Sequence, residues 1–99
     1  MRVRYTPRAL ADLAAILAYI RERNPAGARS VREALEKTVR FIAEYPHVGR
    51  LSGEQDTRVV AIGRYPYLIY WGIEAGELVI LHIRHAARRP WPETDDRTE

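Results

Sequence analysis

The apolar residues of this chain follow a helical period in its first half and a strand pattern in its second half. Residues 7–23 and about 26–44 each repeat apolar side chains at the i, i+3, i+4 and i+7 positions of one helix face. Thr6 can cap the first helix, and Pro7 suits its first position, where the N–H that proline lacks would have no partner. Pro25 divides the two helices because the residue before a proline disfavours the α conformation. The short connection predicts an antiparallel helix hairpin.

Three runs rich in β-branched and aromatic residues follow, and this composition is typical of strands. They cover residues 58–62, 67–73 and 78–84. A turn at 63–66 joins the first pair, and a tight hairpin at 74–77 joins the second, with glycine where a positive φ is expected. Residues 2–5 can add a short strand, and residues 51–56 read as a polar loop. The predicted order is β-αα-βββ, an α+β fold with the helix hairpin packed on an antiparallel sheet.

The last strand carries the most distinctive side chains. Strict alternation predicts one face formed by Val79, Leu81 and Ile83, turned toward the core, with His82 and Arg84 on the opposite face. His85 would then emerge from the core face near the edge of the sheet.

The length of 99 residues fits one domain, expected over residues 1–92 with a flexible acidic tail at 93–99. The longest apolar run, residues 13–20, is far shorter than the roughly 18 residues of a membrane span. The first residues do not form a signal peptide. We therefore expect a soluble cytoplasmic protein with no membrane partner.

The charge is unevenly distributed. Residues 1–92 hold 15 basic and nine acidic residues, a net charge of +6, whereas residues 93–99 carry a net charge of −3. A basic body of this kind fits a polyanion or an acidic protein as its partner.

Basic and aromatic side chains gather at the end of the last strand, where residues 82–91 contain two His, three Arg and one Trp. Arginine binds phosphate or carboxylate with two parallel hydrogen bonds and stays charged, and histidine can move a proton near neutral pH. A solvated strand end with a structural His85 is the alternative. The candidate residues for binding a target are Arg64, Arg84, His85, Arg88, Arg89 and Trp91.

Other chemistry has little support. The chain has no cysteine, which excludes disulfides, thiolate metal sites and a cysteine nucleophile. His82 and His85 are wrongly spaced to share a strand face, and no Asp or Glu lies beside them, so no metal site is expected. Ser30 and Ser52 do not sit in a nucleophile-elbow sequence, and there is no glycine-rich phosphate loop. No cofactor is expected.

Taken in order, several segments resemble the ParE branch of the RelE/ParE toxin superfamily. They are residues 5–13, 20–25, 45–50, 58–60, 65–70 and 81–90. The resemblance covers roughly residues 2–91. It implies a toxin of a type II toxin–antitoxin system that is neutralised by a cognate antitoxin. Such antitoxins usually carry a ribbon–helix–helix DNA-binding domain and an extended tail, so operator DNA would be reached only through the antitoxin.

ParE-type members act on DNA gyrase and trap its cleaved DNA complex, so the resemblance implies an inhibitor that works by binding. RelE-like relatives instead cut mRNA in the ribosome without a metal. Their pattern has an arginine at two positions where this chain has Tyr67 and Ala86. It also has a tyrosine after the last strand, whereas this chain has no tyrosine after Tyr70. His85 with Arg88 instead resembles the His-x-x-Arg of ParE-like chains. Gyrase is therefore the preferred target. A ribosome-dependent mRNA endonuclease and a non-toxic homologue acting only in autorepression remain as alternatives.

The antitoxin is expected in the groove between the helix hairpin and the sheet, where apolar anchors and charge complementarity would hold it. The candidate contacts for it are Arg4, Arg8, Arg40 and Tyr67.

Overall fold

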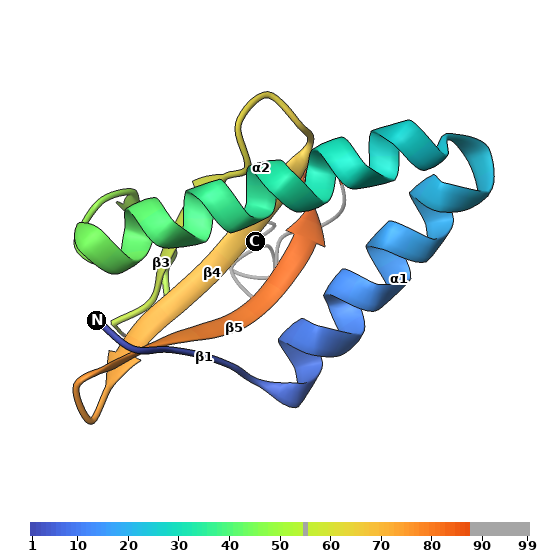
Figure 1. Cartoon of the computed structure of the whole chain (residues 1–99). Coiled ribbons are helices and arrows are strands. Elements are labelled where there is room, and N and C mark those ends of the chain that lie inside the picture. Colours follow the sequence, from blue (N-terminus) through green and yellow to red (C-terminus); the bar gives the residue numbers. More distant parts are fainter. Residues whose placement is uncertain (55, 88–99) are drawn as a thin grey trace.

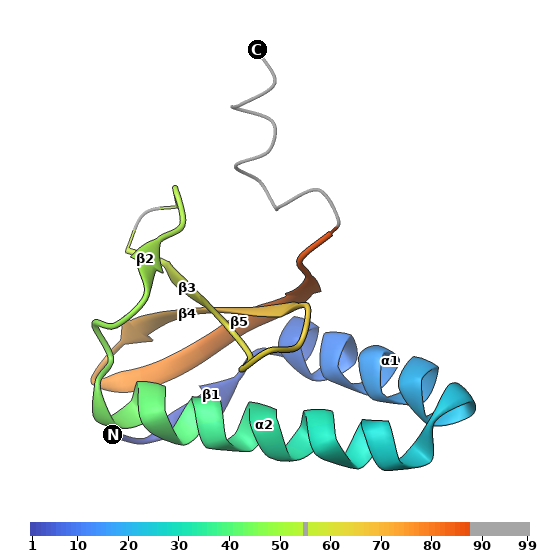
Figure 2. The same cartoon turned by 90° about the horizontal axis from the view of Figure 1, so that it is seen from above.

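Two helices pack on one face of a five-stranded sheet in the computed structural model, which describes residues 1–54 and 56–87 (Figures 1 and 2). The elements are β1 (Val3–Tyr5), α1 (Pro7–Arg23), α2 (Pro25–Glu44), β2 (Arg50–Leu51), β3 (Arg58–Ala61), β4 (Tyr67–Glu74) and β5 (Glu77–His85). The α+β class and the predicted order of the elements are confirmed, with β2 as an addition. The expected acidic tail, residues 93–99, lies outside the described residues.

The sheet has the order β1-β5-β4-β3-β2. Its β3, β4 and β5 strands form the predicted antiparallel meander, but β1 runs parallel to β5. The sheet is therefore mixed, because the chain passes through both helices before it returns beside β1. The two residues of β2 pair with β3 and were not predicted as a strand, since so short a segment has no periodicity to read.

Local capping explains why the helices begin and end where they do. The Thr6 hydroxyl oxygen accepts a hydrogen bond from the Ala9 N–H at 3.0 Å, which caps α1. Asn24 alone connects the helices: its backbone N–H donates to Ile20, and its side chain accepts from the Gly27 N–H at 2.9 Å. This single residue ends one helix and caps the next, which confirms the predicted hairpin.

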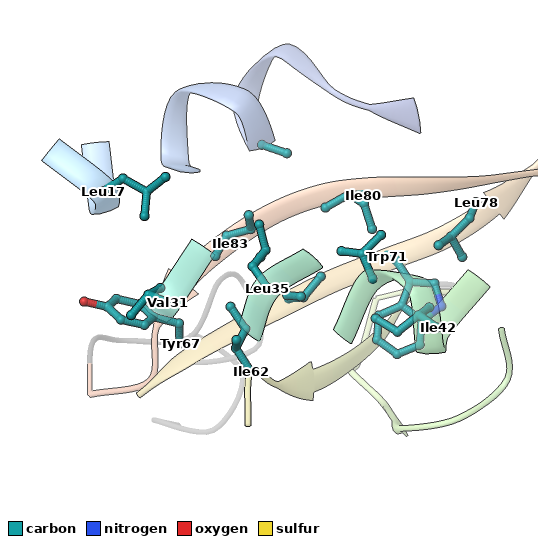
Figure 3. Close-up of a cluster of buried hydrophobic side chains, with 13 residues drawn as sticks. Leu17, Val31, Leu35, Ile42, Ile62, Tyr67, Trp71, Leu78, Ile80 and Ile83 are labelled. Atoms are coloured by element: carbon teal, nitrogen blue, oxygen red, sulfur yellow. The ribbon is translucent and has the colours of Figure 1, made fainter. Parts of the chain in front are cut away.

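The core lies between the helices and the sheet (Figure 3). Leu35 and Ile42 of α2 are at most 2% exposed, and they face the same cluster as Trp71 of β4 and Ile80 of β5. Leu17 brings α1 into this cluster. The amphipathic stripe of α2 thus seals most of the covered face of the sheet.

The prediction that Val79 and Leu81 share the core cluster with Ile83 was wrong: Val79 is only 3% exposed, but neither it nor Leu81 belongs to the cluster beneath the helices. The pairing of β4 with β5 shifts between Tyr70, which faces His82, and Trp71, which faces Ile80. Leu81 is the extra residue of a β-bulge, so the alternation of sides changes there. Leu78 and Ile80 enter the core before the bulge, and Ile83 enters it after the bulge.

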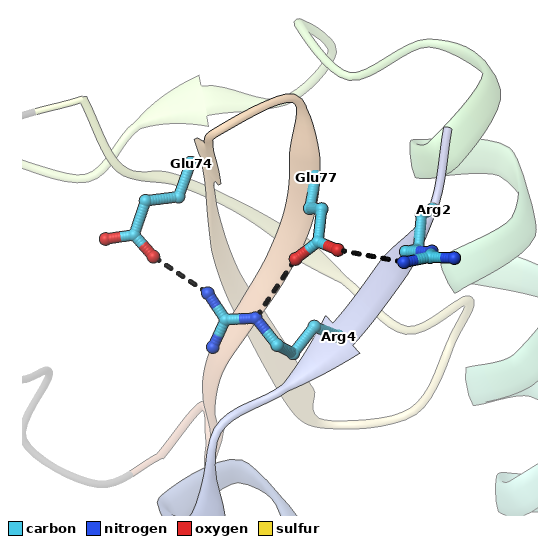
Figure 4. Close-up of polar contacts among 4 residues, drawn as sticks. All are labelled: Arg2, Arg4, Glu74 and Glu77. Atoms are coloured by element: carbon cyan, nitrogen blue, oxygen red, sulfur yellow. Dashed lines mark hydrogen bonds and ion pairs between the residues drawn. The ribbon is translucent and has the colours of Figure 1, made fainter.

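Exposed ion pairs join β1 to the β4–β5 hairpin (Figure 4). Arg4 contacts Glu74 at 2.8 Å and Glu77 at 3.2 Å, and Arg2 lies 3.6 Å from Glu77. Exposed pairs of this kind contribute little individually. They nevertheless account for the position of the Arg4 side chain.

Candidate functional site

A groove of about 640 Å³ lies between α1 and the C-terminal end of β5. We call it the α1–β5 groove, and it is lined by Arg8, Asp12, Ala15, Ile16, Tyr19, Tyr67, Ile83, Arg84, His85 and Ala87.

The groove exists because β1 is shorter than β5. The last backbone bond on this edge of the sheet runs from the Thr6 N–H to the Ile80 carbonyl at 3.0 Å. Beyond it, side chains of the N-cap Thr6 and of α1 take the place of a neighbouring strand: the Thr6 hydroxyl donates to the Leu81 carbonyl at 2.7 Å, and Asp12 Oδ2 accepts from the Ile83 N–H at 3.0 Å. These bonds satisfy backbone groups that an open edge would leave unpaired. They also fix α1 beside the strand end, so the groove has a defined width.

The wall formed by α1 is apolar and largely uncovered. Between Ala9 and Ile20 the only charged residue is Asp12, yet only Ala9 and Leu17 of this stretch are buried. Tyr19, on the groove, is 59% exposed. A helix that is apolar around its circumference is normally covered by other protein. The α1 wall therefore has the character of an interface.

Both α1 and β5 bring positive charge to the groove. Arg84 is half-buried at the strand end, and Arg8 projects from the first turn of α1, with its Nε 3.9 Å from Asp12 Oδ2. The field of these cations reaches His82: burial, and then the charges of Arg8 and Arg84, lower the pKa of that imidazole to about 4. His82 is therefore neutral at neutral pH, and the arginines supply the charge.

His85 has a defined orientation in the groove. Its Nδ1 accepts a hydrogen bond from the Ala87 N–H at 3.0 Å, so the neutral ring carries its proton on Nε2. The ring of Tyr67 packs edge-on against it, with centroids 5.2 Å apart. As predicted, His85 lies on the core-facing side near the sheet edge.

The structure brings together four of the residues singled out from the sequence, and it takes them from both candidate sets. Arg84 and His85 were candidates for the target, and Arg8 and Tyr67 were candidates for the antitoxin; all four line the α1–β5 groove. One surface is therefore available to both kinds of partner.

The remaining candidates lie elsewhere. Arg64 is exposed in the β3–β4 turn, which adjoins the end of β5 because the Ala86 N–H donates to the Pro66 carbonyl at 2.7 Å. Arg4 is engaged in ion pairs, and Arg40 is exposed on α2; neither lines the groove. The candidates outside the described residues are Arg88, Arg89 and Trp91.

Sequence reasoning missed Asp12, Ile16 and Tyr19. Asp12 had a readable signal, because it is the single charge in an otherwise apolar stretch of helix. Ile16 and Tyr19 gave none, since a helical period alone does not say which apolar residues a small sheet leaves uncovered.

Within residues 1–54 and 56–87, no group of three or more His, Asp or Glu side chains is arranged to hold a metal ion. In the same part of the chain, neither helix is long and apolar enough to cross a membrane.

Residues 3–90 match the family described as the ParE toxin of the type II toxin–antitoxin system parDE. The chain belongs to the ParE toxin family. This confirms the family predicted from the sequence. Toxin RelE2 of Caulobacter vibrioides is 39% identical over 87 residues, which cover 88% of this chain and 97% of that protein. Putative toxin Y4kP of Sinorhizobium fredii is 36% identical over 92 residues, which cover 93% of this chain and 94% of that protein.

Solved structures of toxins share the fold of this ParE-family chain. A chain of a chromosomal ParDE system from P. aeruginosa superposes with a TM-score of 0.76 at 24% identity, covering 86% of this chain and 95% of its own length. A chain of the intact E. coli RelBE toxin–antitoxin complex gives 0.65 at 19% identity, covering 88% and 98%. At these identities the likeness concerns the fold.

Proposed function

We propose that this ParE-family toxin is neutralised by a cognate antitoxin seated in the α1–β5 groove and that its target is DNA gyrase. The observation that carries the proposal is the groove itself, which combines the exposed apolar wall of α1 with the cations Arg8 and Arg84.

The groove suits an antitoxin segment with apolar anchors and acidic residues. Ile16 and Tyr19 offer contact area for the anchors, and Arg8 and Arg84 can pair with carboxylates around them. The net charge of +6 over residues 1–92 favours an acidic partner over a basic one. The P. aeruginosa and E. coli neighbours come from systems described as ParDE and RelBE, which supports such a pairing. A ribbon–helix–helix domain in the antitoxin would supply the contact with operator DNA.

Gyrase is favoured over mRNA by the residues at two positions. Tyr67 stands where the RelE pattern has a phosphate-binding arginine, and it is only 8% exposed and packed against His85. Ala86 replaces a second arginine. The carboxylate of Asp12 is engaged with the Ile83 N–H. This arrangement supports a toxin that works by binding rather than by cleaving RNA.

A supercoiling assay tests the target. The purified full-length chain is incubated with gyrase, ATP and relaxed plasmid, and linear DNA is scored after protease treatment. We expect linear DNA with the wild type and a strong loss of it with Arg84→Glu, whereas Arg40→Glu, an exposed cation away from the groove, should behave like the wild type. If ribosome-bound mRNA is cut instead, the endonuclease alternative holds. If folded protein does neither, the non-toxic alternative holds.

The site of the antitoxin has its own test. Tyr19→Asp places a charge on the apolar wall, and Phe41→Asp, on α2, is its control because both side chains are more than half exposed. We expect only Tyr19→Asp to weaken co-purification with the antitoxin, by at least tenfold in affinity on the scale of an interface anchor. Equal effects of the two substitutions would place the antitoxin elsewhere without changing the result of the gyrase assay.

A further inference from the structure

A second hollow, of about 390 Å³, lies between α1 and α2 near the turn that joins them. It is lined by Leu17, Arg21, Pro25, Ala28, Arg29 and Arg32, and we call it the arginine hollow. The turn forms an outer corner of the molecule (Figure 1). The hollow is distinct from the α1–β5 groove and shares no lining residue with it.

The three arginines that line the hollow make no ion pair, among the described residues, that would stabilise the fold. Arg21 comes from the end of α1, and Arg29 and Arg32 lie about one turn apart on α2. Within residues 1–54 and 56–87, no carboxylate forms an ion pair with any of the three. Like charges that line one hollow without an ion pair repel one another. The first turn of α2 holds no acidic residue that would reduce this repulsion. An anion in the hollow would relieve it.

We propose that the arginine hollow binds a phosphate group of the duplex DNA backbone. Guanidinium groups are planar, permanently charged and matched to the oxygens of a phosphate. Three arginines from two helices line one hollow, and a backbone phosphate is a small protruding group that can enter it.

The lining of the hollow favours duplex DNA over a peptide. Its floor is closed, since Leu17 and Ala28 are 4% and 6% exposed. An acidic peptide would find charge there but little exposed surface of Leu17 or Ala28 on which to anchor a side chain, and peptide interfaces depend on such anchors. The α1–β5 groove is the contrasting case, because Tyr19 is 59% exposed there although the Arg23 guanidinium lies over its ring.

The lining also argues against single-stranded nucleic acid. Proteins that bind single strands stack the bases on aromatic side chains. The hollow contains no aromatic residue. Contacts with the phosphates of a duplex require only cations and hydrogen-bond donors.

The position of the hollow leaves it open when the groove is filled. Tyr19 lines the groove, and Arg21 lies two residues further along α1, which is about 200° around the helix. The two sites therefore face different sides of α1. The chain would contact DNA directly, in addition to any contact made through an antitoxin, and this inference does not depend on the gyrase proposal.

The test measures binding of the full-length chain to a short fluorescent DNA duplex by anisotropy over a series of salt concentrations. The test variant is Arg21→Gln/Arg29→Gln/Arg32→Gln. The control variant, Lys37→Gln/Arg40→Gln/Arg50→Gln, removes the same charge from exposed positions outside the hollow. Circular dichroism confirms that both fold.

We expect the slope of log K against log salt to decrease by about 0.9 for each phosphate contact that the test variant loses. Affinity at low salt should fall roughly tenfold, as for the loss of one charge-assisted hydrogen bond. The control should keep the wild-type slope. Equal losses in the two variants would overturn the proposal, because net charge alone would then explain binding. If the test variant binds the matching single strand or polyglutamate more weakly than the wild type but binds the duplex equally well, the proposal is overturned as well.

Discussion

At the residue scale, Gly49 occupies a position with no space for a side chain. Its φ is +78°, and a Cβ there would lie 2.7 Å from the Val59 carbonyl oxygen and 2.9 Å from Trp71 Cη2. The indole N–H of Trp71 donates to the Pro46 carbonyl at 3.1 Å, so the turn after α2 is seated on this buried ring. The glycine of the 45–50 segment is thus structural.

We expect Gly49→Ala to lower the free energy of unfolding by about 2–4 kcal/mol, since backbone strain and steric overlap add. Gly63→Ala is the control, because Gly63 also has a positive φ, +54°, but has no atom within 4 Å of the Cβ position. It should cost only about 1 kcal/mol. Urea denaturation of both variants checks this, and equal losses would show that contact with Trp71 does not matter.

His82 makes stability depend on pH. It is 2% exposed and stacks on Tyr70 with ring centroids 4.3 Å apart. Its pKa is lowered from 6.5 to about 4, mainly by burial. The folded state therefore binds this proton more weakly than the unfolded state does. The contribution of neutral His82 to the free energy of unfolding is complete above about pH 6.5 and declines as the pH falls toward 4.

We expect His82→Phe to keep the stacked ring and to flatten the pH dependence of unfolding between about pH 4 and 6.5. Thermal unfolding over that range measures it. His47→Gln, at an exposed position, should leave the dependence as in the wild type. If the stability of His82→Phe falls with decreasing pH as steeply as that of the wild type, other groups cause the acid sensitivity.

At the element scale, one carboxylate of α1 bonds directly to the backbone of β5. Asp12 accepts the Ile83 N–H at 3.0 Å, at a point where β1 has already ended. Removing the acceptor leaves a partly buried backbone donor without its partner.

We therefore expect Asp12→Ala to destabilise the fold by about 1–3 kcal/mol, whereas Asp12→Asn, which keeps an acceptor oxygen, should cost less. Hydrogen exchange at the Ile83 amide provides the local measurement, with faster exchange in Asp12→Ala. If exchange there is unchanged, Asp12 does not hold the strand edge.

At the scale of the whole molecule, the charge of the body should govern how fast an acidic antitoxin associates. Residues 1–92 carry a net charge of +6. Long-range attraction between opposite charges raises the association rate and is screened by salt. We expect the association rate with the antitoxin to fall with added salt while the dissociation rate changes much less. Stopped-flow or surface-binding kinetics measure both rates, and an association rate independent of salt would contradict the idea that charge steers this encounter.

Much of the fold could be predicted because it depends on local sequence patterns. Thr6, Pro7 and Pro25 mark the helix ends as expected, and Gly76 has the positive φ expected of the β4–β5 turn. The family resemblance was also readable, because it rests on an ordered series of such segments. The site was predicted only in part. The basic strand end with Arg84 and His85 was predicted, but the presence of Asp12 and Tyr19 in the groove was not.

The two helices, the three main strands, the basic body and the cationic strand end could all be predicted, because each depends on neighbouring residues or on composition. The face of β5 that enters the core depends instead on long-range pairing, since the bulge at Leu81 arises from pairing with β4. The tertiary structure also decided that α1 and β5, whose groove residues are about 70 positions apart, form one groove. Both outcomes depend on contacts between distant segments, and a local pattern cannot specify the register or the length of a strand that lies beside it.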